Sequence, residues 1–173
     1  MNLKALSALG YGMYLVSSKD GEKISAQIAN TVFQVTAEPP KIAAALNKQN
    51  LTCELVKKSG ILAISILSEN TPMTFIGNFG FKSGRNFNKF EKIGYTAGVT
   101  GAPIVTENAV GYLEAKITGQ FDAGTHILFV AEIEDARVID DSKPMTYAYY
   151  HLIKKGTSPK TAPTYIKDEA QGR

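Results

Sequence analysis

The sequence predicts a mainly β protein, folded as a closed or nearly closed antiparallel barrel with a few short helices. Short segments rich in β-branched and aromatic residues recur along the chain at fairly regular spacing. Turn signals separate these segments, beginning with Asp20-Gly21. Helical segments do not alternate with the strands, which argues against a doubly wound parallel sheet. The 173 residues are enough for one domain with a substantial core.

The expected strands differ in how they would be buried. Residues 61–67 are nearly all apolar, which is typical of a strand covered on both faces. Residues 112–118 alternate, so we expect Leu113, Ala115 and Ile117 to face one way and Glu114, Lys116 and Thr118 to face the other. The segments expected to form strands are 11–18, 24–36, 41–46, 61–67, 112–118, 125–134 and 136–139.

Three short segments are expected to be helices. Asn50 can cap the first, which would end at Gly60. Thr71-Pro72 can start the second, because proline is tolerated at the first helical position. The third spans residues 145–155 and has an apolar stripe at helical spacing. That stripe consists of Met145, Tyr149, Leu152 and Ile153.

Composition bounds the possible functions. A net charge of +3 with scattered basic residues does not favour nucleic-acid binding, although it suits a small anionic ligand. We expect no membrane span, because no apolar run approaches about 20 residues. The single cysteine, Cys53, excludes a disulfide within the chain and a cysteine-based metal site. Residues 1–10 lack the features of a secretory signal, so a cytoplasmic location is expected.

Several common sites find no support in the sequence. No Gly-x-Gly-x-x-Gly motif follows an expected strand, and residues 80–85 lack the spacing of a phosphate-binding Walker loop. His126 and His151 are the only histidines, which makes a multi-histidine metal site unexpected. The chain contains no recognisable nucleophile elbow. We expect a domain over residues 1–156 and a C-terminal tail over residues 157–173, which are rich in Ser, Thr, Pro and Lys. The alternatives for this tail are a segment over the surface, a frayed end, a docked segment or the remnant of a linker.

A candidate anion site lies where residues 41–46 run into Asn47-Lys48-Gln49-Asn50 and the first helix begins. Free N–H groups and the positive dipole end of a helix start favour a phosphate, and Lys48 adds a full charge. In the alternative, Asn50 only caps the helix and Lys48 is solvated, and helix caps are much commoner than phosphate sites. Other donors that could contribute are Asn47, Thr52, Arg85 and Lys89.

Residues 27–40, QIANTVFQVTAEPP, followed by Ile42 to Lys48, resemble the signature of the flavin reductase-like FMN-binding split-barrel family. In that family, a strand of small and hydroxyl residues leads to a Pro-Pro turn and then to a polar phosphate-binding loop. The resemblance covers roughly residues 5–156 and is strongest to archaeal ferric reductases and to the flavin domains of flavin reductase–rubredoxin fusions. Further matching segments are 61–67, 79–90, 124–130 and 147–152.

The resemblance implies an FMN-binding split barrel of Greek-key type, a homodimer, and reduction of FMN by NADH or NADPH. It implies that one group of residues borders the flavin ring: Gln27, Ala29, Asn30 and Thr31. A second group would hold the phosphate and ribityl chain: Asn47, Lys48, Gln49, Asn50 and Thr52. A third would close the pocket and exclude water: Phe79, Gly80, Phe81, Arg85, Phe87 and Lys89.

The resemblance also suggests a nicotinamide site. His126 matches the histidine of the family's Gly-x-His segment and would be the catalytic residue, orienting the hydride donor over the flavin. Alternatively, it is a structural histidine in a strand. Further residues that could clamp the dinucleotide lie on the last helix: Tyr147, Tyr150, His151 and Lys154. Alternatively, that helix packs on the barrel with a basic outer face.

These observations leave three alternative functions. The first is an NAD(P)H oxidoreductase that passes electrons through FMN to ferric complexes, free flavin or a rubredoxin. The second is a non-enzymatic FMN module that relays electrons from a partner protein. The third is an unrelated small barrel that binds another phosphorylated ligand. A rubredoxin domain within this chain is excluded, because such a domain needs paired cysteines and Cys53 stands alone.

Overall fold

A computed structural model of the protein describes residues 2–165. Its ordered elements are a 3-10 helix, nine strands and three α-helices among these residues. In chain order they are η1 (Leu3–Ala8), β1 (Tyr14–Asp20), β2 (Lys23–Ala29), β3 (Val32–Ala37), β4 (Pro40–Asn47), α1 (Leu51–Ser59), β5 (Ile61–Leu67), α2 (Met73–Gly80), β6 (Thr96–Ala97), β7 (Pro103–Ile104), β8 (Ala109–Asp122), β9 (His126–Val138) and α3 (Tyr147–Leu152).

Seven strands form one antiparallel sheet in the order β2-β1-β5-β8-β9-β4-β3, and β6 pairs separately with β7. The edge strands β2 and β3 are consecutive in the chain, and only Asn30 and Thr31 separate them. Such a short connection can reach from one edge to the other only if the sheet curls round on itself. Because the two edges meet without pairing, the sheet is a split barrel, as predicted.

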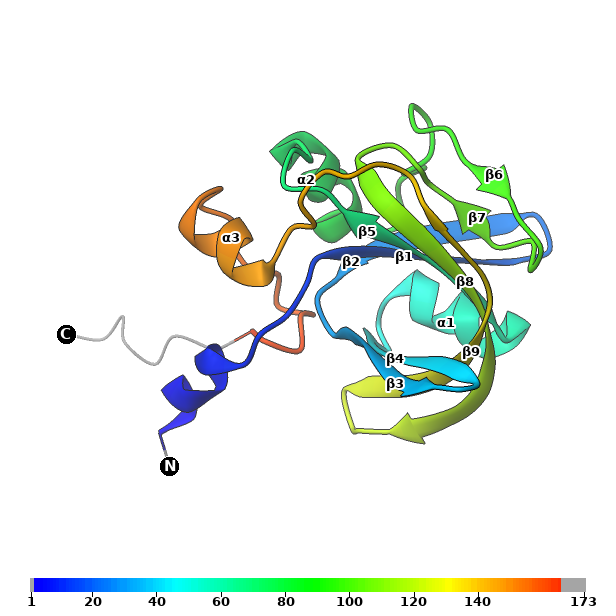
Figure 1. Ribbon diagram of the computed structural model, residues 1–173, viewed down its shortest axis with the longest axis horizontal. Helices are drawn as coiled ribbons and strands as arrows, with labels where there is room; N and C mark the ends of the chain where they lie inside the picture. The colour runs from blue at the N-terminus through cyan, green and yellow to red at the C-terminus, as the bar shows by residue number, and fades with distance from the viewer. Residues whose placement is uncertain (1, 166–173) are drawn as a thin grey trace.

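Helix α1 lies inside the curve of the sheet, between β1 and β2 on one side and β4 on the other (Figure 1). Its side chains Cys53 and Val56 belong to the main core, together with Leu46, Ile64 and Phe129. The helix therefore plugs the barrel where its edge strands separate, and its first residues are held next to β2 and β4.

Most of the expected strands are confirmed, and β5 has the predicted bounds. The expectation of one strand over residues 24–36 was wrong, because the chain turns at Asn30-Thr31 from one edge of the sheet to the other. The break expected at residue 135 was also wrong, since β9 continues through it. The register between β8 and β9 shifts near this point, which keeps the long strands paired.

The helices at Asn50 and Thr71 are confirmed as α1 and α2, whereas the third is shorter than expected. Met145 precedes the helix and is buried; its backbone carbonyl accepts from the N–H of Met13, and its N–H donates to the carbonyl of Leu67. The predicted apolar stripe was wrong at its far end, since Leu152 and Ile153 are 67% and 63% exposed.

Within β8, the side chain of Glu114 is completely buried. Its carboxylate accepts hydrogen bonds from the backbone N–H groups of Val99 and Thr100, and from the Thr100 hydroxyl. Glu114 thereby fastens the loop between β6 and β7 to the sheet. Among residues 2–165, no helix is long and apolar enough to cross a membrane.

Candidate functional site

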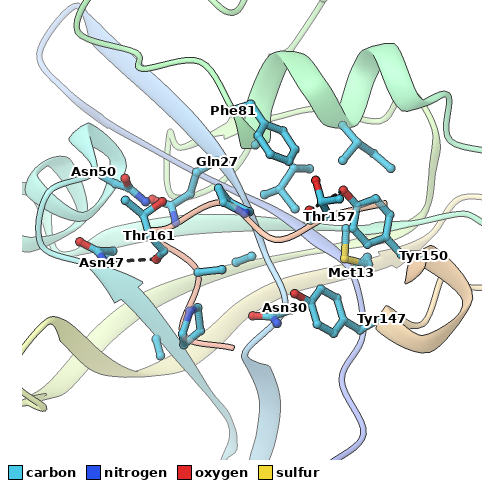
Figure 2. A pocket seen from close by; sticks show the side chains of 18 of the residues that line it. Met13, Gln27, Asn30, Asn47, Asn50, Phe81, Tyr147, Tyr150, Thr157 and Thr161 are labelled. Atoms are coloured by element: carbon cyan, nitrogen blue, oxygen red, sulfur yellow. Dashed lines mark hydrogen bonds between the residues drawn. The ribbon is translucent and has the colours of Figure 1, made fainter. Parts of the chain in front are cut away.

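A cavity opens where the edges of the barrel meet (Figure 2). It encloses about 580 Å³ of space outside protein atoms, a volume that includes open solvent. The barrel and helix residues that line it are Met13, Gln27, Ile28, Ala29, Asn30, Ala45, Asn47, Asn50, Ile76, Gly80, Phe81, His126, Tyr147 and Tyr150. A segment that follows α3 contributes Thr157, Pro159, Thr161, Ala162 and Pro163.

Half of the site residues expected from the sequence line this one cavity: Gln27, Ala29, Asn30, Asn47, Asn50, Gly80, Phe81, His126, Tyr147 and Tyr150. They come from β2, β4, β9, α2, α3 and the loops that follow β2, β4 and α2, so the fold gathers residues more than 120 positions apart in the chain. Sequence reasoning missed the five residues after α3, because a Ser-, Thr- and Pro-rich stretch has the composition of a surface tail.

Gln27 is 7% exposed, and it faces the cavity from β2. Its Oε1 atom has no hydrogen-bond partner, and it is the only such buried side-chain atom among the residues described. An unpaired buried acceptor costs about 1–3 kcal/mol, so a ligand that donates a hydrogen bond here would bind favourably. The cavity is therefore prepared for a ligand with an N–H or O–H group.

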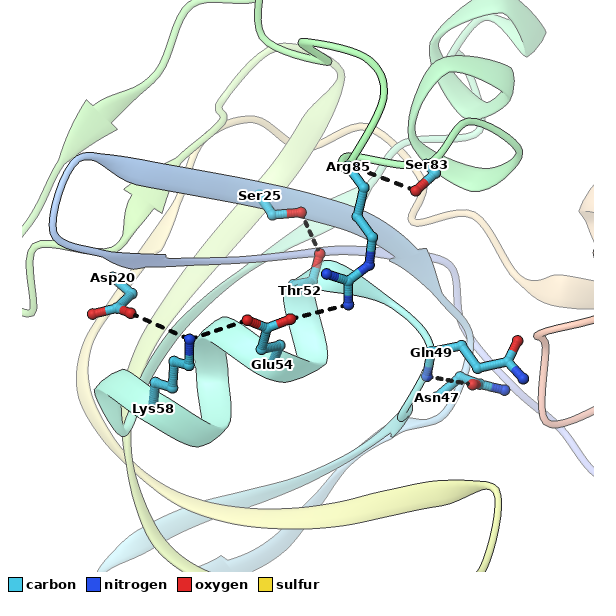
Figure 3. Close-up of polar contacts among 9 residues, drawn as sticks. All are labelled: Asp20, Ser25, Asn47, Gln49, Thr52, Glu54, Lys58, Ser83 and Arg85. Carbon is cyan, nitrogen blue, oxygen red and sulfur yellow. Dashed lines mark hydrogen bonds and ion pairs between the residues drawn. The ribbon is translucent and has the colours of Figure 1, made fainter.

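The corner between β4 and α1 is ordered by Asn47. Its Oδ1 atom accepts a hydrogen bond from the backbone N–H of Gln49 at 2.9 Å, as Figure 3 shows. Asn50 occupies the N-cap position of α1, but its side chain makes no capping hydrogen bond and lines the cavity instead. The side chain of Asn50 is thus available for a ligand. The simple capping interpretation of this residue was wrong in that respect.

Lys48 lies at the same corner but does not line the cavity. Its Nζ atom forms an ion pair with the exposed carboxylate of Asp122, with an N–O distance of 2.6 Å. The hydrogen bond from Lys48 lowers the pKa of Asp122 below its usual value. Lys48 is itself 38% exposed and can turn from this surface partner toward an anion at the corner.

Three other expected cofactor residues lie in the interior beside the cavity. Thr52 is buried and shares a hydrogen bond with Ser25 at 2.9 Å, and Phe79 is a core residue. The Lys89 ammonium is 7% exposed and donates to the backbone carbonyls of Ala26 and Phe79, both at 3.0 Å. Burial lowers the pKa of Lys89 to about 8. These side chains hold the walls of the site in place.

The remaining expected cofactor residues point elsewhere. The Arg85 guanidinium forms an ion pair with Glu54 on α1 at 3.0 Å (Figure 3). The Phe87 side chain is 55% exposed, and it borders a second, smaller cavity together with Lys89. Thr31 donates to the side chain of its neighbour Asn30. Gln49 contributes its backbone N–H to the corner already described.

His126 begins β9 opposite Asn47 in the sheet. Its Nε2 atom lies 3.1 Å from the carbonyl oxygen of Thr161, and its Nδ1 atom lies 2.9 Å from the hydroxyl of Thr125. Because a carbonyl only accepts, Nε2 carries the hydrogen, and in the neutral ring Nδ1 accepts from Thr125. Burial lowers the pKa of His126, and the hydrogen bond to Thr161 partly opposes that effect.

The expected residues of α3 divide into two groups. Tyr147 and Tyr150 line the cavity with their rings stacked at 6.1 Å. His151 and Lys154 do not line it; the His151 ring packs edge-on against Tyr147, and its Nδ1 atom lies 2.8 Å from the carbonyl oxygen of Gly156. No three His, Cys, Asp or Glu side chains within residues 2–165 form a group that could hold a metal ion.

Residues 157–165, which we call the strap, cross the mouth of the cavity. The Thr161 carbonyl accepts from Asn47 Nδ2 as well as from His126, both at 3.1 Å. The hydroxyl of Thr164 accepts from Asn30 Nδ2 at 2.9 Å. Of the alternatives for the expected tail, these residues dock on the barrel; the rest of the expected tail, 166–173, lies outside the described residues.

Comparison with known proteins agrees with this architecture. Residues 6–154 match the model of the flavin reductase like domain. The ferric-chelate reductase (NAD(P)H) of Archaeoglobus fulgidus is 47% identical over 169 residues, which is 98% of this chain and 100% of that protein. The high molecular weight rubredoxin of Moorella thermoacetica is 47% identical over 165 residues, covering 95% of this chain and 72% of the relative.

The solved structure of NADH:FAD oxidoreductase SgcE6 from Streptomyces globisporus superposes with a TM-score of 0.74. The match covers 82% of this chain and 84% of that one at 20% sequence identity, so it shows the shared fold alone. The domain match and the two relatives at 47% identity extend over nearly the whole chain. The protein therefore belongs to the family of the flavin reductase like domain.

Proposed function

We propose that the protein is a flavin-dependent NAD(P)H oxidoreductase that binds FMN in the cavity between the barrel and the strap. The observation that carries this proposal is the unpaired, buried Oε1 atom of Gln27, which faces a cavity lined by half of the expected flavin and nicotinamide residues. The isoalloxazine ring of a flavin carries an N–H group, which can donate a hydrogen bond to the unpaired Oε1 atom of Gln27. The full-length similarity to a ferric-chelate reductase supports the same activity.

The residues present fit a flavin mononucleotide. Gln27, Ala29 and Asn30 would border the ring from β2 and the turn after it, with Ala29 small enough to allow close approach. Asn47, Asn50 and the start of α1 would bind the ribityl chain and phosphate, with Lys48 as the nearest cation. Bound FMN supplies the redox chemistry, since a flavin takes up a hydride and releases electrons to an acceptor.

On the nicotinamide side, the protein supplies orientation. His126 Nε2–H is a donor at the edge of the cavity, and Tyr147 and Tyr150 offer aromatic faces on which a nicotinamide ring can stack. We expect these groups to align the hydride donor with the flavin and to keep water away from it. Because His126 is hydrogen-bonded to the strap, part of its role is to hold that wall in place.

We also propose a homodimer. The edge strand β3 is exposed from Phe33 to Ala37, with Phe33 52% and Val35 47% exposed. In the sheet register, Phe33 of β3 pairs with a residue of β4 that in turn pairs with Val130 of β9. Phe121 of β8 is 67% exposed and pairs with Leu128, two residues before Val130 on β9. Side chains two residues apart share one face of a sheet, so this apolar surface is continuous and suited to an equivalent partner.

Ferric complexes, free flavin and a rubredoxin stay open as acceptors. Similarity to a ferric-chelate reductase supports the first, and similarity to a high molecular weight rubredoxin supports a redox protein partner. A second candidate function, an FMN relay reduced by a partner protein, is favoured by one observation: the Thr161 carbonyl already accepts the hydrogen of His126 Nε2. That contact reduces what His126 can offer to a nicotinamide.

The test is anaerobic stopped-flow mixing of the purified, flavin-loaded protein with NADH or NADPH, after the released cofactor has been identified by chromatography. The enzyme proposal expects FMN in the protein and rapid bleaching of its absorbance near 450 nm. Bound flavin without bleaching would favour the relay. A protein that is colourless and takes up no flavin from solution would overturn both.

A further inference from the structure

The strap is fixed at its base to helix α3. The hydroxyl of Tyr150 donates to the Thr157 carbonyl at 3.0 Å, and His151 holds the Gly156 carbonyl. Gly156 is buried, and a Cβ atom at this position would collide with the ring of Tyr150. The close approach therefore requires glycine, and it sets the direction in which the strap leaves the helix.

The far part of the strap is tied to the opposite side of the cavity. Asn47 and His126 both donate to the Thr161 carbonyl, and Asn30 donates to the Thr164 hydroxyl. The Tyr147 hydroxyl lies within hydrogen-bond distance of Ser158 and, at 2.8 Å, of Thr164. The strap thus joins three elements, β4, β9 and α3, to the turn that follows β2.

The strap forms one side of the cavity, with Thr157, Pro159, Thr161, Ala162 and Pro163 as its lining residues, and β2 and β4 contribute to the other side. Figure 2 shows Thr161 beside Asn47 and Thr157 beside Tyr150. Gln27 is on the barrel side, and no atom of the strap satisfies its Oε1. A segment that replaced the ligand would be expected to pair this acceptor, whereas a segment that covers the ligand leaves it free.

We propose that the strap is the outer wall of the flavin site, and that its hydrogen bonds set how long the flavin stays bound. This inference rests on the proposed function, since it assumes that the ligand of the cavity is a flavin. It assigns Asn30, Asn47 and His126 as positioning residues that hold the strap over the ligand. It also assigns Ser158 and Thr164, which do not line the cavity, as determinants of flavin retention.

The experiment compares the full chain with the double variant Ser158→Ala/Thr164→Val, which loosens the strap and changes no cavity-lining residue. Flavin dissociation is followed by recovery of flavin fluorescence after dilution. We expect dissociation about tenfold faster in the double variant, equivalent to about 1.4 kcal/mol. The matched control is Tyr165→Phe, which removes a strap hydroxyl that has no hydrogen-bond partner within residues 2–165 and should dissociate like wild type.

Trypsin supplies a second measurement that needs no variant. Lys160 is exposed in the middle of the strap, and cleavage after it can be recognised from the masses of the fragments. If the strap closes over the flavin, saturating FMN slows cleavage after Lys160. Faster cleavage with FMN, or slower flavin release in the double variant, would mean that the strap competes with the ligand and would overturn the proposal.

The outcomes separate this inference from the proposed function. If wild-type protein binds no flavin, the proposed function fails and the strap proposal fails with it. If wild-type protein binds flavin and the double variant releases it at the wild-type rate, only the strap proposal is overturned. Equal acceleration in the Tyr165→Phe control would also overturn it, because the effect would then not depend on the hydrogen bonds of the strap.

Discussion

At the scale of single residues, Gln27 offers the most direct test of the cavity. Gln27→Leu should raise the dissociation constant for flavin about tenfold, since one hydrogen bond contributes about 0.5–1.5 kcal/mol. The free energy of unfolding of the ligand-free protein should not fall, because the change removes an unpaired buried acceptor. Fluorescence titration and chemical denaturation measure the two quantities.

The matched control for this change is Gln120→Leu, on the exposed part of β8. It introduces the same side chain away from the cavity, so flavin affinity should be unaffected. Equal flavin affinity in Gln27→Leu and wild type would contradict the assignment of Gln27 to the ligand.

The protonation of His126 predicts a pH dependence of stability. Burial lowers its pKa in the folded protein below the ordinary value of 6.5, so the unfolded chain binds the proton more tightly. As pH falls below about 6.5, unfolding is therefore favoured, and the free energy of unfolding should decrease; above that pH this contribution is constant. Urea denaturation between pH 5 and 8 measures it.

His126→Gln is the comparison for this measurement, because its amide can still donate to the Thr161 carbonyl but does not titrate. The stability difference between wild type and this variant should shift in favour of the variant as the pH falls from 7 to 5. A shift in the other direction would mean that the folded protein holds the His126 proton more tightly than the unfolded chain does.

At the scale of elements, the corner between β4 and α1 predicts a phosphate-dependent effect. Lys48→Ala should raise the dissociation constant for FMN ten- to a hundredfold, since a charged hydrogen bond contributes about 1.5–3 kcal/mol. Riboflavin, which lacks the phosphate, should bind both proteins alike. Lys41→Ala is the control, because Lys41 lies on the same strand and pairs with Glu132 at 3.5 Å. An effect on riboflavin as large as that on FMN would contradict the phosphate assignment.

The same elements show what the sequence could predict. The apolar run of β5 and the start signals of α1 and α2 are local, and all three elements form, although Asn50 makes no capping hydrogen bond and Pro72 rather than Thr71 is the N-cap of α2. The break at Asn30-Thr31 was missed, because no Gly or Pro marks it and it is closure of the sheet that makes the chain turn there. The burial of Glu114 could not be predicted for a similar reason: its partners, Val99 and Thr100, lie on the loop between β6 and β7.

For the site, as for the fold, the sequence predicted some features and could not predict those that depend on long-range contacts. Resemblance identified residues that converge on one cavity, but spacing alone could not show that Thr52 and Lys89 use their polar atoms inside the walls. The strap was missed because the contacts that tie it across the cavity include pairs more than 110 positions apart, Asn47 with Thr161 and Asn30 with Thr164. No local pattern records a contact of that range.

At the scale of the whole molecule, the proposed dimer can be tested on the apolar face of β3. Phe33→Lys places a charge on that face and should shift the protein from dimer to monomer, as measured by light scattering across a concentration series. Val99→Lys is the control, since Val99 is 71% exposed in the loop between β6 and β7. A wild-type protein that is monomeric at all concentrations would contradict the dimer.

The span of the cavity has a consequence for how the protein matures. Its lining extends from Met13 to Pro163, so the binding site stays incomplete until residue 163 has left the ribosome. The seven-stranded sheet ends at Val138 and can assemble before that point. The proposed flavin site can therefore be completed only after every strand of the sheet has been synthesised.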